Sequence, residues 1–441
     1  MSSLFDELRR MEKPPLLTKY FEPDATVETM PLEKLKAFQA EALALVVTRA
    51  YRRSEFYNGK FMAAGITPED IRSLDDAAQL PFTTKEELRQ DPWAILACFK
   101  EDIALVHVAT GTTGGKEIYV PWTWQDFYLN ELTPALPHLV DVRIGDICLN
   151  ALPYEMSSSG LAFHKVFMSG CRATVIPAGK AGAYSSPEKT VRVMQDLEPS
   201  IVITTPSYSM LLAEAARAIG FDLASLPLRR MWLTGEGCSF AFRDRVERIW
   251  GTKANFYYGS LEGGGMGIEC DAHRGYHIPM SHVLVEIVDP DTGRVLEPGE
   301  VGEIVVTCLL RWDTPLIRYR TQDLGYIDPD ECTCGVALPR LFLRGRRVDQ
   351  LEIGGIEFSP FYLEDFLMRM PEVGNWYEFV APPGAKMLRV RIEVAPGVEK
   401  SPQLAEKLAS QLEFSVGIPC EFELVEKISR PKSKTIRVVK E

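Results

Sequence analysis

The chain lacks long hydrophobic runs and an excess of positive charge. No segment approaches the ~20 apolar residues of a membrane span, and residues 1–13 contain no apolar run of signal-peptide length. Forty-nine Lys and Arg residues against 61 Asp and Glu residues give a net charge of −12, which argues against a general binder of nucleic acid or of an anionic membrane. An anionic ligand would therefore need a local site of hydrogen-bond donors.

Paired cysteines and repeats are also lacking. The nine cysteines are odd in number and widely spread, which fits a reducing, cytoplasmic compartment better than a disulfide framework. No internal repeat or low-complexity tract interrupts the chain. With 46% hydrophobic residues over 441 positions, the sequence can bury a sizeable core in roughly two to four domains.

The middle of the chain alternates between short apolar runs and helical patterns. Residues 31–53 keep apolar side chains at helical spacing, and Thr84–Glu87 form a capping-box pattern that opens another helix. Helical stretches such as Pro187–Leu197 and Tyr208–Ile219 then separate strand-like runs. These runs are Ile103–Val108, Ile147–Leu152, Ala173–Pro177, Ile201–Thr204 and Arg230–Thr234. The alternation predicts an α/β sheet with helices on its faces.

Two further regions follow. Residues 281–327 are rich in strand-like runs and turns, which predicts a smaller β-rich subdomain. The sequence Arg-Gly-Arg-Arg at 344–347 marks a boundary, beyond which about 95 residues have α+β character, with a strand at Arg389–Val394 and a helix at Gln403–Leu412.

The loop Thr110-Gly111-Thr112-Thr113-Gly114-Gly115-Lys116 combines hydroxyls, glycines and a lysine. Glycine lets backbone N–H groups approach an anion, and lysine adds positive charge, so the loop suits a polyphosphate. It is not a Walker A loop, because the Gly–Lys pair arrives one residue early and Glu117 occupies the Ser/Thr position. It does not match G-x-G-x-x-G either. Taken alone, the loop is equally well a flexible surface turn.

Four other clusters follow this loop in a fixed order. They are Gly235-Glu236-Gly237, Tyr258-Gly259-Ser260-Leu261-Glu262, Arg318-Tyr319-Arg320-Thr321-Gln322-Asp323, and Gly345-Arg346 leading to Gly354-Gly355. In this order they resemble the adenylate-forming superfamily of acyl-CoA synthetases. Pro81–Lys85, Thr205–Tyr208 and Pro315–Thr321 are especially similar to phenylacetate–CoA ligases. The resemblance extends from about residue 25 to the end of the chain.

The resemblance implies roles in binding ATP. The loop with Thr110, Gly111, Thr112, Thr113, Gly114 and Lys116 would wrap the β- and γ-phosphates, with Lys116 as a phosphate contact. Tyr258, beside Gly259, would stack on adenine, and the backbone around Gly235, Glu236 and Gly237 would lie along the edge of the base. Asp323 would accept both ribose hydroxyls, Arg346 would add a ribose or phosphate contact, and Glu262 would hold Mg²⁺.

It also implies a two-domain α/β protein. A large N-terminal adenylation domain of several subdomains, residues 1–344, would bind ATP and the acid. A small mobile α+β domain, residues 345–441, would carry the catalytic Lys434, which bridges the carboxylate and the α-phosphate. After acyl-AMP forms, this domain would turn, and Gly354 and Gly355 would line a channel for the thiol of CoA.

Two positions depart from the family pattern. Leu261 stands where the family usually has Ser or Thr before the glutamate, with Ser260 one place earlier. Val348 stands at the hinge position, which is commonly Asp or Lys, and Asp349 follows it. A hydroxyl near the phosphate or metal is therefore shifted or lost, and the pivot of the small domain is less defined.

The implied activity is an acid–thiol ligase that converts an aromatic or arylacetic acid to acyl-AMP and then to acyl-CoA. The acid pocket would involve Tyr154, Phe163, His164 and Tyr208, whose rings can flank a planar substrate. For Phe163, plain core packing is an equal alternative. The partners would be the carboxylic acid, ATP and CoA, with no nucleic acid or membrane, and the family suggests a homodimer. The alternatives are transfer of the acyl group to a carrier protein or an amine, and a non-catalytic nucleotide- or zinc-binding homologue.

A second metal-type cluster combines Cys332 and Cys334 with the more distant Cys270 and His277. Three thiols and an imidazole form a zinc-type ligand set, and relatives of this family can carry such a structural Zn²⁺ site. His273 is the rival histidine, and ordinary thiols in a reducing compartment are the alternative.

Overall fold

The computed structural model describes residues 14–22, 25–109, 116–129, 136–430 and 437–440. Contacts group the chain into two compact units. The first unit comprises residues 1–141, 259–321 and 326–342, and the second comprises residues 142–258, 322–325 and 343–441. Within the described ranges, no helix has the length and apolar character needed to cross a membrane. The functional boundary predicted after residue 344 is a different division of the chain and stays a prediction.

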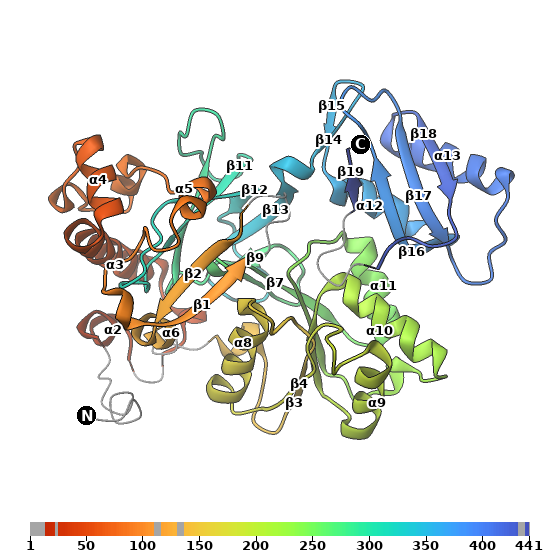
Figure 1. Cartoon of the computed structure of the whole chain (residues 1–441), viewed down its shortest axis with the longest axis horizontal. Helices are drawn as coiled ribbons and strands as arrows, with labels where there is room; N and C mark the ends of the chain where they lie inside the picture. Colours follow the sequence, from red (N-terminus) through yellow and green to blue (C-terminus); the bar gives the residue numbers. More distant parts are fainter. Residues whose placement is uncertain (1–13, 23–24, 110–115, 130–135, 431–436, 441) are drawn as a thin grey trace. The chain divides into compact units, whose positions relative to one another are not determined.

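Helices dominate the beginning of the first unit (Figure 1). They are α2 (Pro15–Tyr20), α3 (Leu32–Arg53), α4 (Glu55–Ala64), α5 (Lys85–Gln90), α6 (Trp124–Leu129) and α7 (Pro137–Val140). α3 confirms the predicted helix and buries Leu35, Phe38 and Val46 along one face. α5 begins at the predicted capping box, where the Thr84 hydroxyl accepts a hydrogen bond from the Glu87 N–H.

The strands of the first unit pair antiparallel. β1 (Ile103–Ala109) and β2 (Ile118–Thr123) form a separate two-stranded sheet. The remaining strands that lie wholly or in part in this unit are β8 (Gly264–Glu269), β9 (Tyr276–His277), β10 (Val283–Val288), β11 (Gly302–Cys308), β12 (Tyr319–Asp328) and β13 (Arg340–Arg346). β9 pairs with β8 and β13, and β10 pairs with β11, all antiparallel, which confirms the β-rich region.

The placement of β1 corrects one expectation. The run Ile103–Val108 was predicted to belong to the alternating α/β series, yet among the described residues it pairs with β2 in a separate two-stranded sheet. Eight residues separate β1 from β2, whereas a parallel crossover needs about a dozen or more. The short connection therefore favours an antiparallel pair.

The second unit contains a parallel sheet in the order β7-β6-β5-β3-β4. These strands are β3 (Ile147–Asn150), β4 (Thr174–Pro177), β5 (Ile201–Thr204), β6 (Arg230–Thr234) and β7 (Ala254–Ser260). The helices between them are α8 (Ser158–Lys165), α9 (Pro187–Leu197), α10 (Pro206–Ala218) and α11 (Phe240–Trp250), of which α9, α10 and α11 pack side by side (Figure 1). The predicted α/β alternation is confirmed here.

The C-terminal part of the second unit has α+β character, as predicted. A four-stranded sheet has the order β18-β17-β16-β19, and α13 packs against the outer strand β18 while α12 packs against the inner strand β16. The elements are β14 (Leu351–Ile353), β15 (Ile356–Phe358), α12 (Pro360–Arg369), β16 (Val373–Val380), β17 (Leu388–Val394), α13 (Pro402–Val416), β18 (Cys420–Leu424) and β19 (Val438–Val439).

Candidate nucleotide- and acid-binding site

The strand order of the second unit contains a topological switch point between β3 and β5. From β3 the chain adds β4 on one side, then returns to add β5, β6 and β7 on the other. In open α/β sheets, ligands bind outside the carboxyl ends of the strands at such a point. The predicted acid-binding residue Tyr154 follows β3, Tyr208 follows β5, and Gly235 follows β6. These residues thus leave the sheet at the edge where a ligand is expected.

Aromatic side chains meet near this edge. The Tyr154 hydroxyl lies 3.1 Å from Nδ1 of His164 on α8, and the Phe163 ring meets Tyr257 edge-on, with centroids 4.8 Å apart. Burial raises the pKa of Tyr154 to about 12, so the phenol stays neutral and can donate a hydrogen bond. Tyr208 is buried, and its hydroxyl accepts a hydrogen bond of 3.0 Å from the Ala181 N–H. Tyr208 therefore supports the loop after β4.

Glu236 is held by a buried charge pair that the sequence did not predict. Its carboxylate lies 3.1 Å from Nζ of Lys180 and accepts a hydrogen bond of 2.9 Å from the Ser207 hydroxyl. Burial alone would raise the pKa of Glu236, but the charges of Lys180 and then Arg437 outweigh it and lower the pKa. Lys180 and Glu236 are 56 positions apart, and no local pattern links them.

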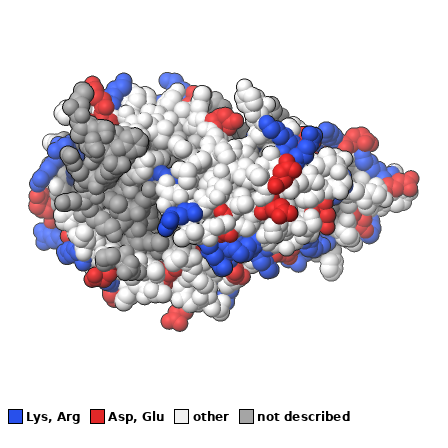
Figure 2. Space-filling model, turned by 90° about the horizontal axis from the view of Figure 1, so that it is seen from below, with Lys and Arg blue, Asp and Glu red and all other residues white. Residues whose placement is uncertain are grey.

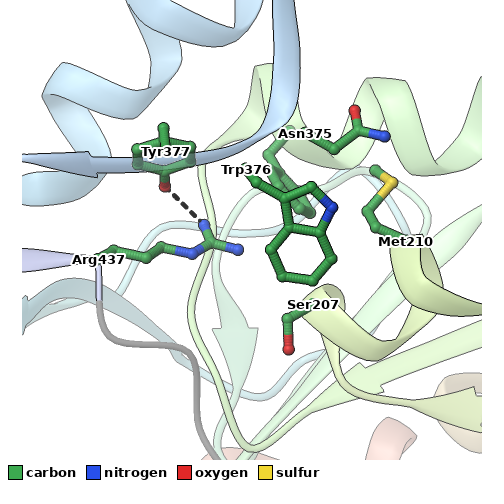
Figure 3. A pocket seen from close by; sticks show the side chains of 7 residues that line it. Ser207, Met210, Asn375, Trp376, Tyr377 and Arg437 are labelled. Atoms are coloured by element: carbon green, nitrogen blue, oxygen red, sulfur yellow. Dashed lines mark hydrogen bonds between the residues drawn. The ribbon is translucent and has the colours of Figure 1, made fainter. Parts of the chain in front are cut away.

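A small pocket adjoins this pair. It is lined by Ser207 and Met210 on α10, Phe242 on α11, Asn375, Trp376 and Tyr377 on β16, and Arg437 before β19 (Figure 3). Arg437 donates a hydrogen bond of 2.7 Å to the Tyr377 hydroxyl, pairs with the buried Glu364, and lies over the Phe242 ring. None of the four predicted acid-binding residues is among these lining residues.

Three predicted ATP-binding residues from separate segments come together. The Tyr258 hydroxyl donates a hydrogen bond of 2.7 Å to Oδ2 of Asp323, and Nε of Arg346 lies 3.7 Å from Oδ1 of the same carboxylate. The Asp323 side chain keeps 19% of its surface exposed, so it remains accessible to a ligand. A partly exposed carboxylate beside a phenol and a guanidinium can accept hydrogen bonds from paired hydroxyls.

Glu262 lies in the turn between β7 and β8. It is 7% exposed, and within the described ranges its carboxylate makes no hydrogen bond or ion pair. A buried carboxylate without a partner suits a cation, since burying an unpaired charge is costly, and Mg²⁺ prefers oxygen ligands. The Ser260 hydroxyl accepts a hydrogen bond of 2.9 Å from the Gly263 N–H. This hydroxyl is thus engaged within the turn. Ser260 therefore uses its hydroxyl locally, next to the position where Leu261 replaces the usual Ser or Thr.

The glycines predicted to line a channel have a conformational explanation as well. Gly354 and Gly355 form the two-residue turn between β14 and β15, with φ values of 61° and 81°. Such hairpin turns require positive φ at both central residues, which favours glycine. A Cβ at either position would meet no atom within 4 Å. Their role in a CoA channel stays a prediction.

Close approach explains Gly259. A Cβ there would lie 2.5 Å from the Gly264 carbonyl oxygen, so the position requires glycine.

The lysine of the predicted phosphate loop, Lys116, is exposed, and its carbonyl accepts a hydrogen bond of 3.1 Å from Arg89. The rest of that loop, Thr110, Gly111, Thr112, Thr113 and Gly114, and the predicted catalytic Lys434 lie outside the described residues.

The cysteine and histidine cluster is assembled as a compact set. Ligand atoms of Cys270, His277, Cys332 and Cys334 all lie within 4.8 Å of one another. The Cys270 and Cys332 sulfurs are 3.7 Å apart, and Cys334 Sγ is 3.4 Å from His277 Nε2. Tetrahedral zinc with Zn–S bonds of about 2.3 Å places two sulfurs roughly 3.8 Å apart, whereas a disulfide needs about 2.05 Å. The spacing fits zinc ligands.

The ring orientation of His277 supports the same fit. Its Nδ1 lies 3.0 Å from the Leu338 carbonyl oxygen, so Nδ1 carries the proton and Nε2 faces the sulfurs. Burial lowers the pKa of His277, which keeps the ring in the neutral form that binds a metal. His273 is not among these four residues, and its Nδ1 lies 3.4 Å from Oε2 of Glu269. Of the two rival histidines, the structure places His277 with the cysteines.

Charged side chains of both signs are interspersed on the face shown in Figure 2. Near the residues described above, Lys180, Arg346 and Arg437 provide local positive charge. This distribution agrees with the net charge of −12, under which an anionic ligand depends on local donors.

The chain matches known enzymes over most of its length. The family model of the AMP-binding enzymes matches residues 39–307, and that of the AMP-binding enzyme C-terminal domain matches residues 355–441. A phenylacetate-coenzyme A ligase of Thermus thermophilus is 33% identical over 436 residues, covering 92% of this chain and 96% of that protein. The phenylacetate-coenzyme A ligase of Escherichia coli K12 is 30% identical, with 92% and 94% covered.

The fold has close relatives among solved structures. A 2-hydroxyisobutyryl-CoA ligase in complex with 2-HIB-AMP superposes with a TM-score of 0.86 at 23% identity, covering 94% of this chain and 91% of that one. The fold and the sequence matches define the class as adenylate-forming enzymes. The chain belongs to the AMP-binding enzyme family, and within it the chain is phenylacetate–CoA ligase-like.

Proposed function

We propose that the protein is an AMP-forming acid–CoA ligase whose substrate is an aromatic or arylacetic carboxylic acid. The observation that carries the proposal is the grouping of Tyr258, Asp323 and Arg346, which come from three segments and leave a carboxylate accessible for a ribose. The phenylacetate-coenzyme A ligases that cover nine-tenths of the chain support the same activity.

In the first step, a carboxylate oxygen of the acid attacks the α-phosphorus of ATP, and pyrophosphate leaves. The protein's task is to position the reactants and offset phosphate charge. Asp323 would hold the ribose hydroxyls, Tyr258 would stack on adenine, and Lys434 would bridge the acid and the α-phosphate. Glu262 would hold Mg²⁺, which when bound supplies neutralising charge for the phosphates.

In the second step, the thiol sulfur of CoA attacks the acyl carbon, its proton is lost, and AMP leaves. Residues 345–441 would turn between the two steps, so that Lys434 withdraws and Gly354 and Gly355 face the thiol. Nζ of Lys440 donates hydrogen bonds of 2.6 and 2.7 Å to the carbonyls of Val348 and Gln350. This contact links the residue after β19 to the segment that holds the predicted hinge position Val348.

The aromatic preference rests on the residues at the switch point. Phe163 and Tyr257 present an edge-to-face pair, and the neutral Tyr154 phenol adds a hydrogen-bond donor beside His164. Aromatic pairs of this kind accept a further ring in an offset or edge-on arrangement. An arylacetate or benzoate-type acid fits this chemistry better than a long aliphatic acid.

The cluster of Cys270, His277, Cys332 and Cys334 would hold a structural Zn²⁺. Four protein ligands complete a tetrahedral shell and leave no open position for a substrate. Its function would be to hold together the turn after β8, the strand β9 and the loop before β13.

The deciding experiment measures AMP release with ATP and CoA against a panel of phenylacetate, benzoate, the phthalate isomers and short aliphatic acids. We expect CoA-dependent AMP release with an aromatic acid and formation of the matching thioester. Acyl-AMP that accumulates regardless of CoA would instead indicate an acceptor such as a carrier protein or an amine. An absence of ATP–pyrophosphate exchange with every acid would favour a non-catalytic homologue.

A further inference from the structure

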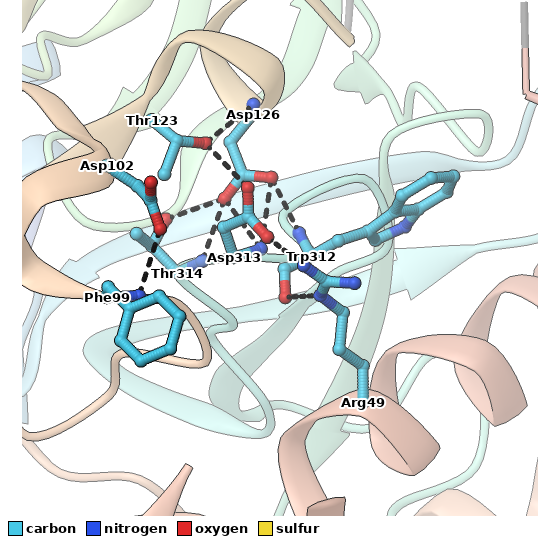
Figure 4. A network of polar contacts seen from close by, with 8 residues as sticks. All are labelled: Arg49, Phe99, Asp102, Thr123, Asp126, Trp312, Asp313 and Thr314. Atoms are coloured by element: carbon cyan, nitrogen blue, oxygen red, sulfur yellow. Dashed lines mark hydrogen bonds and ion pairs between the residues drawn. The ribbon is translucent and has the colours of Figure 1, made fainter. Parts of the chain in front are cut away.

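A buried aspartate organises the turn that follows β11. Asp126, at the start of α6, is fully buried and accepts hydrogen bonds from three consecutive main-chain N–H groups, those of Trp312, Asp313 and Thr314 (Figure 4). Two of these bonds measure 2.8 Å and the third 3.0 Å. The Thr314 hydroxyl donates a further bond of 2.9 Å to the same carboxylate. Asp126 therefore fixes both the path of this turn and the direction of the Thr314 hydroxyl.

The Thr314 hydroxyl in turn orients the Arg311 guanidinium. Since its proton is directed at Asp126, its lone pairs are left to accept, and they receive Nη2 and Nε of Arg311 at 3.1 and 3.3 Å. Arg311 is 2% exposed, and its guanidinium lies over the Trp122 ring, 4.5 Å from the centroid. Its third contact is a bond of 2.6 Å from Nη1 to the main-chain carbonyl of Glu262.

The end of this chain of contacts is the unpartnered carboxylate described above. The Glu262 side chain makes no hydrogen bond or ion pair within the described part of the molecule, so its position depends on its own main chain. Among the described residues, Arg311 is the one side chain that donates a hydrogen bond to the main chain of Glu262. Because Nε and Nη2 of this buried guanidinium are held by Thr314, its Nη1 holds the Glu262 carbonyl in a fixed direction.

We propose that Arg311, oriented by Thr314 and Asp126, is a positioning residue that sets the Glu262 carboxylate for the divalent cation of ATP. The proposal rests on the proposed function, because it takes Glu262 as the cation ligand. Groups behind a metal ligand commonly change metal affinity by about 10- to 100-fold when they are removed. A purely structural role for the same contacts would change stability and leave metal dependence unaltered.

The test compares ATP binding with and without the cation. Calorimetry measures the dissociation constant of ATP at saturating Mg²⁺ and again in EDTA, and the EDTA value divided by the Mg²⁺ value gives the contribution of the cation. The variants are Thr314→Val, which is isosteric and lacks the hydroxyl, Thr314→Ser, which keeps it, and Arg311→Met. Gln39→Met is the matched control, because Gln39 is 2% exposed and its amide donates to the Met280 and Val283 carbonyls, in the same unit.

We expect Thr314→Val and Arg311→Met to reduce the ratio about tenfold, almost entirely through the Mg²⁺ measurement. Thr314→Ser should retain the wild-type ratio, and Gln39→Met should lower thermal stability without changing the ratio. If Arg311→Met does not fold, the Val and Ser variants of Thr314 decide the matter.

An unchanged ratio in Thr314→Val, or an equal fall in Gln39→Met, would overturn the inference. The half-saturating Mg²⁺ concentration for AMP release gives a second reading and should rise about tenfold in the same variants. A wild-type protein that binds ATP with Mg²⁺ but releases no AMP with any acid would refute the proposed function and leave this inference open to the binding test.

Discussion

The Tyr258 hydroxyl donates a hydrogen bond of 2.7 Å to Oδ2 of Asp323, a residue 65 positions further along the chain. This contact orients the carboxylate and occupies one of its acceptor sites, while Arg346 lies near the other oxygen at 3.7 Å. A carboxylate has about four lone-pair positions, so acceptors remain for two ribose hydroxyls. The phenol thus has two proposed roles: its ring stacks on adenine, and its hydroxyl aligns the group that would bind the sugar.

Removing this hydroxyl should weaken ATP binding. In Tyr258→Phe the ring remains, but the Asp323 carboxylate loses a bond of the kind that contributes about 1.5–3 kcal/mol when one partner is charged. We expect the KM for ATP to rise roughly tenfold or more, with a smaller change in kcat. Tyr20→Phe is the matched control, because it removes a 2.9 Å phenol–carboxylate bond to Glu41 elsewhere. An ATP KM that is unchanged in Tyr258→Phe would contradict the proposed role of the pair.

The cysteine cluster should bind about one zinc ion per chain. Metal analysis of the purified protein should find this ion, and the Cys332→Ser and His277→Ala variants should lose it. Because metal binding at a structural site adds to folding free energy, both variants should melt several degrees lower. His273→Ala and Cys420→Ser serve as controls and should keep the ion, since neither residue belongs to the cluster. Zinc retained in Cys332→Ser would count against the assigned ligands.

Local patterns predicted the elements well where the signals were self-contained. The helix expected at Pro187–Leu197 is α9 at the same residues, because the Ser186 hydroxyl caps it and Pro187 occupies its first position. The helix expected at Tyr208–Ile219 begins two residues earlier, at Pro206, where Thr205 supplies the cap. By contrast, nothing within Ile103–Val108 indicated whether its partner strand would be parallel, and the assignment to the α/β series was wrong.

The candidate site shows the same division between local and long-range signals. Motif order predicted Tyr258, Asp323 and Arg346, and the structure brings these three together. It did not predict Lys180, whose contact with Glu236 arises only because the loops after β4 and β6 meet. The role of Arg311 could not be predicted from local sequence either, since it depends on a hydrogen bond to a carbonyl 49 positions away. Buried polar partners are chosen by the fold, and a single sequence carries no periodic signal for them.

The buried pair of Lys180 and Glu236 should make stability depend on pH. The pKa of Glu236 is lowered in the folded protein, so its contribution is present above the ordinary value near 4.5 and is lost as the pH falls below it. Glu236→Gln should remove this contribution and leave Lys180 buried without its counter-charge, which commonly costs about 3–5 kcal/mol.

The measurement is the free energy of unfolding in denaturant between pH 7 and pH 3.5. The wild-type protein should lose stability more steeply below pH 4.5 than Glu236→Gln does. The double variant Lys180→Met with Glu236→Gln should be more stable at pH 7 than Glu236→Gln alone, because no unpaired charge remains. Parallel pH profiles for the wild type and Glu236→Gln would show that Glu236 does not titrate with folding.

Lys434 should act in only one of the two proposed half-reactions. If it bridges the acid and the α-phosphate, Lys434→Ala should slow acid-dependent ATP–pyrophosphate exchange by about 100-fold or more, the size of effect seen when one charge-stabilising group is removed. Thioester formation from a supplied acyl-AMP and CoA should be nearly unchanged, because the lysine would have withdrawn by then. Lys432→Ala, two positions away in the same basic run, is the control and should leave both rates near wild type. Exchange at the full rate in Lys434→Ala would move the catalytic role to another cation. An equal loss in both half-reactions would indicate that the substitution disturbs the whole of residues 345–441 rather than one chemical step.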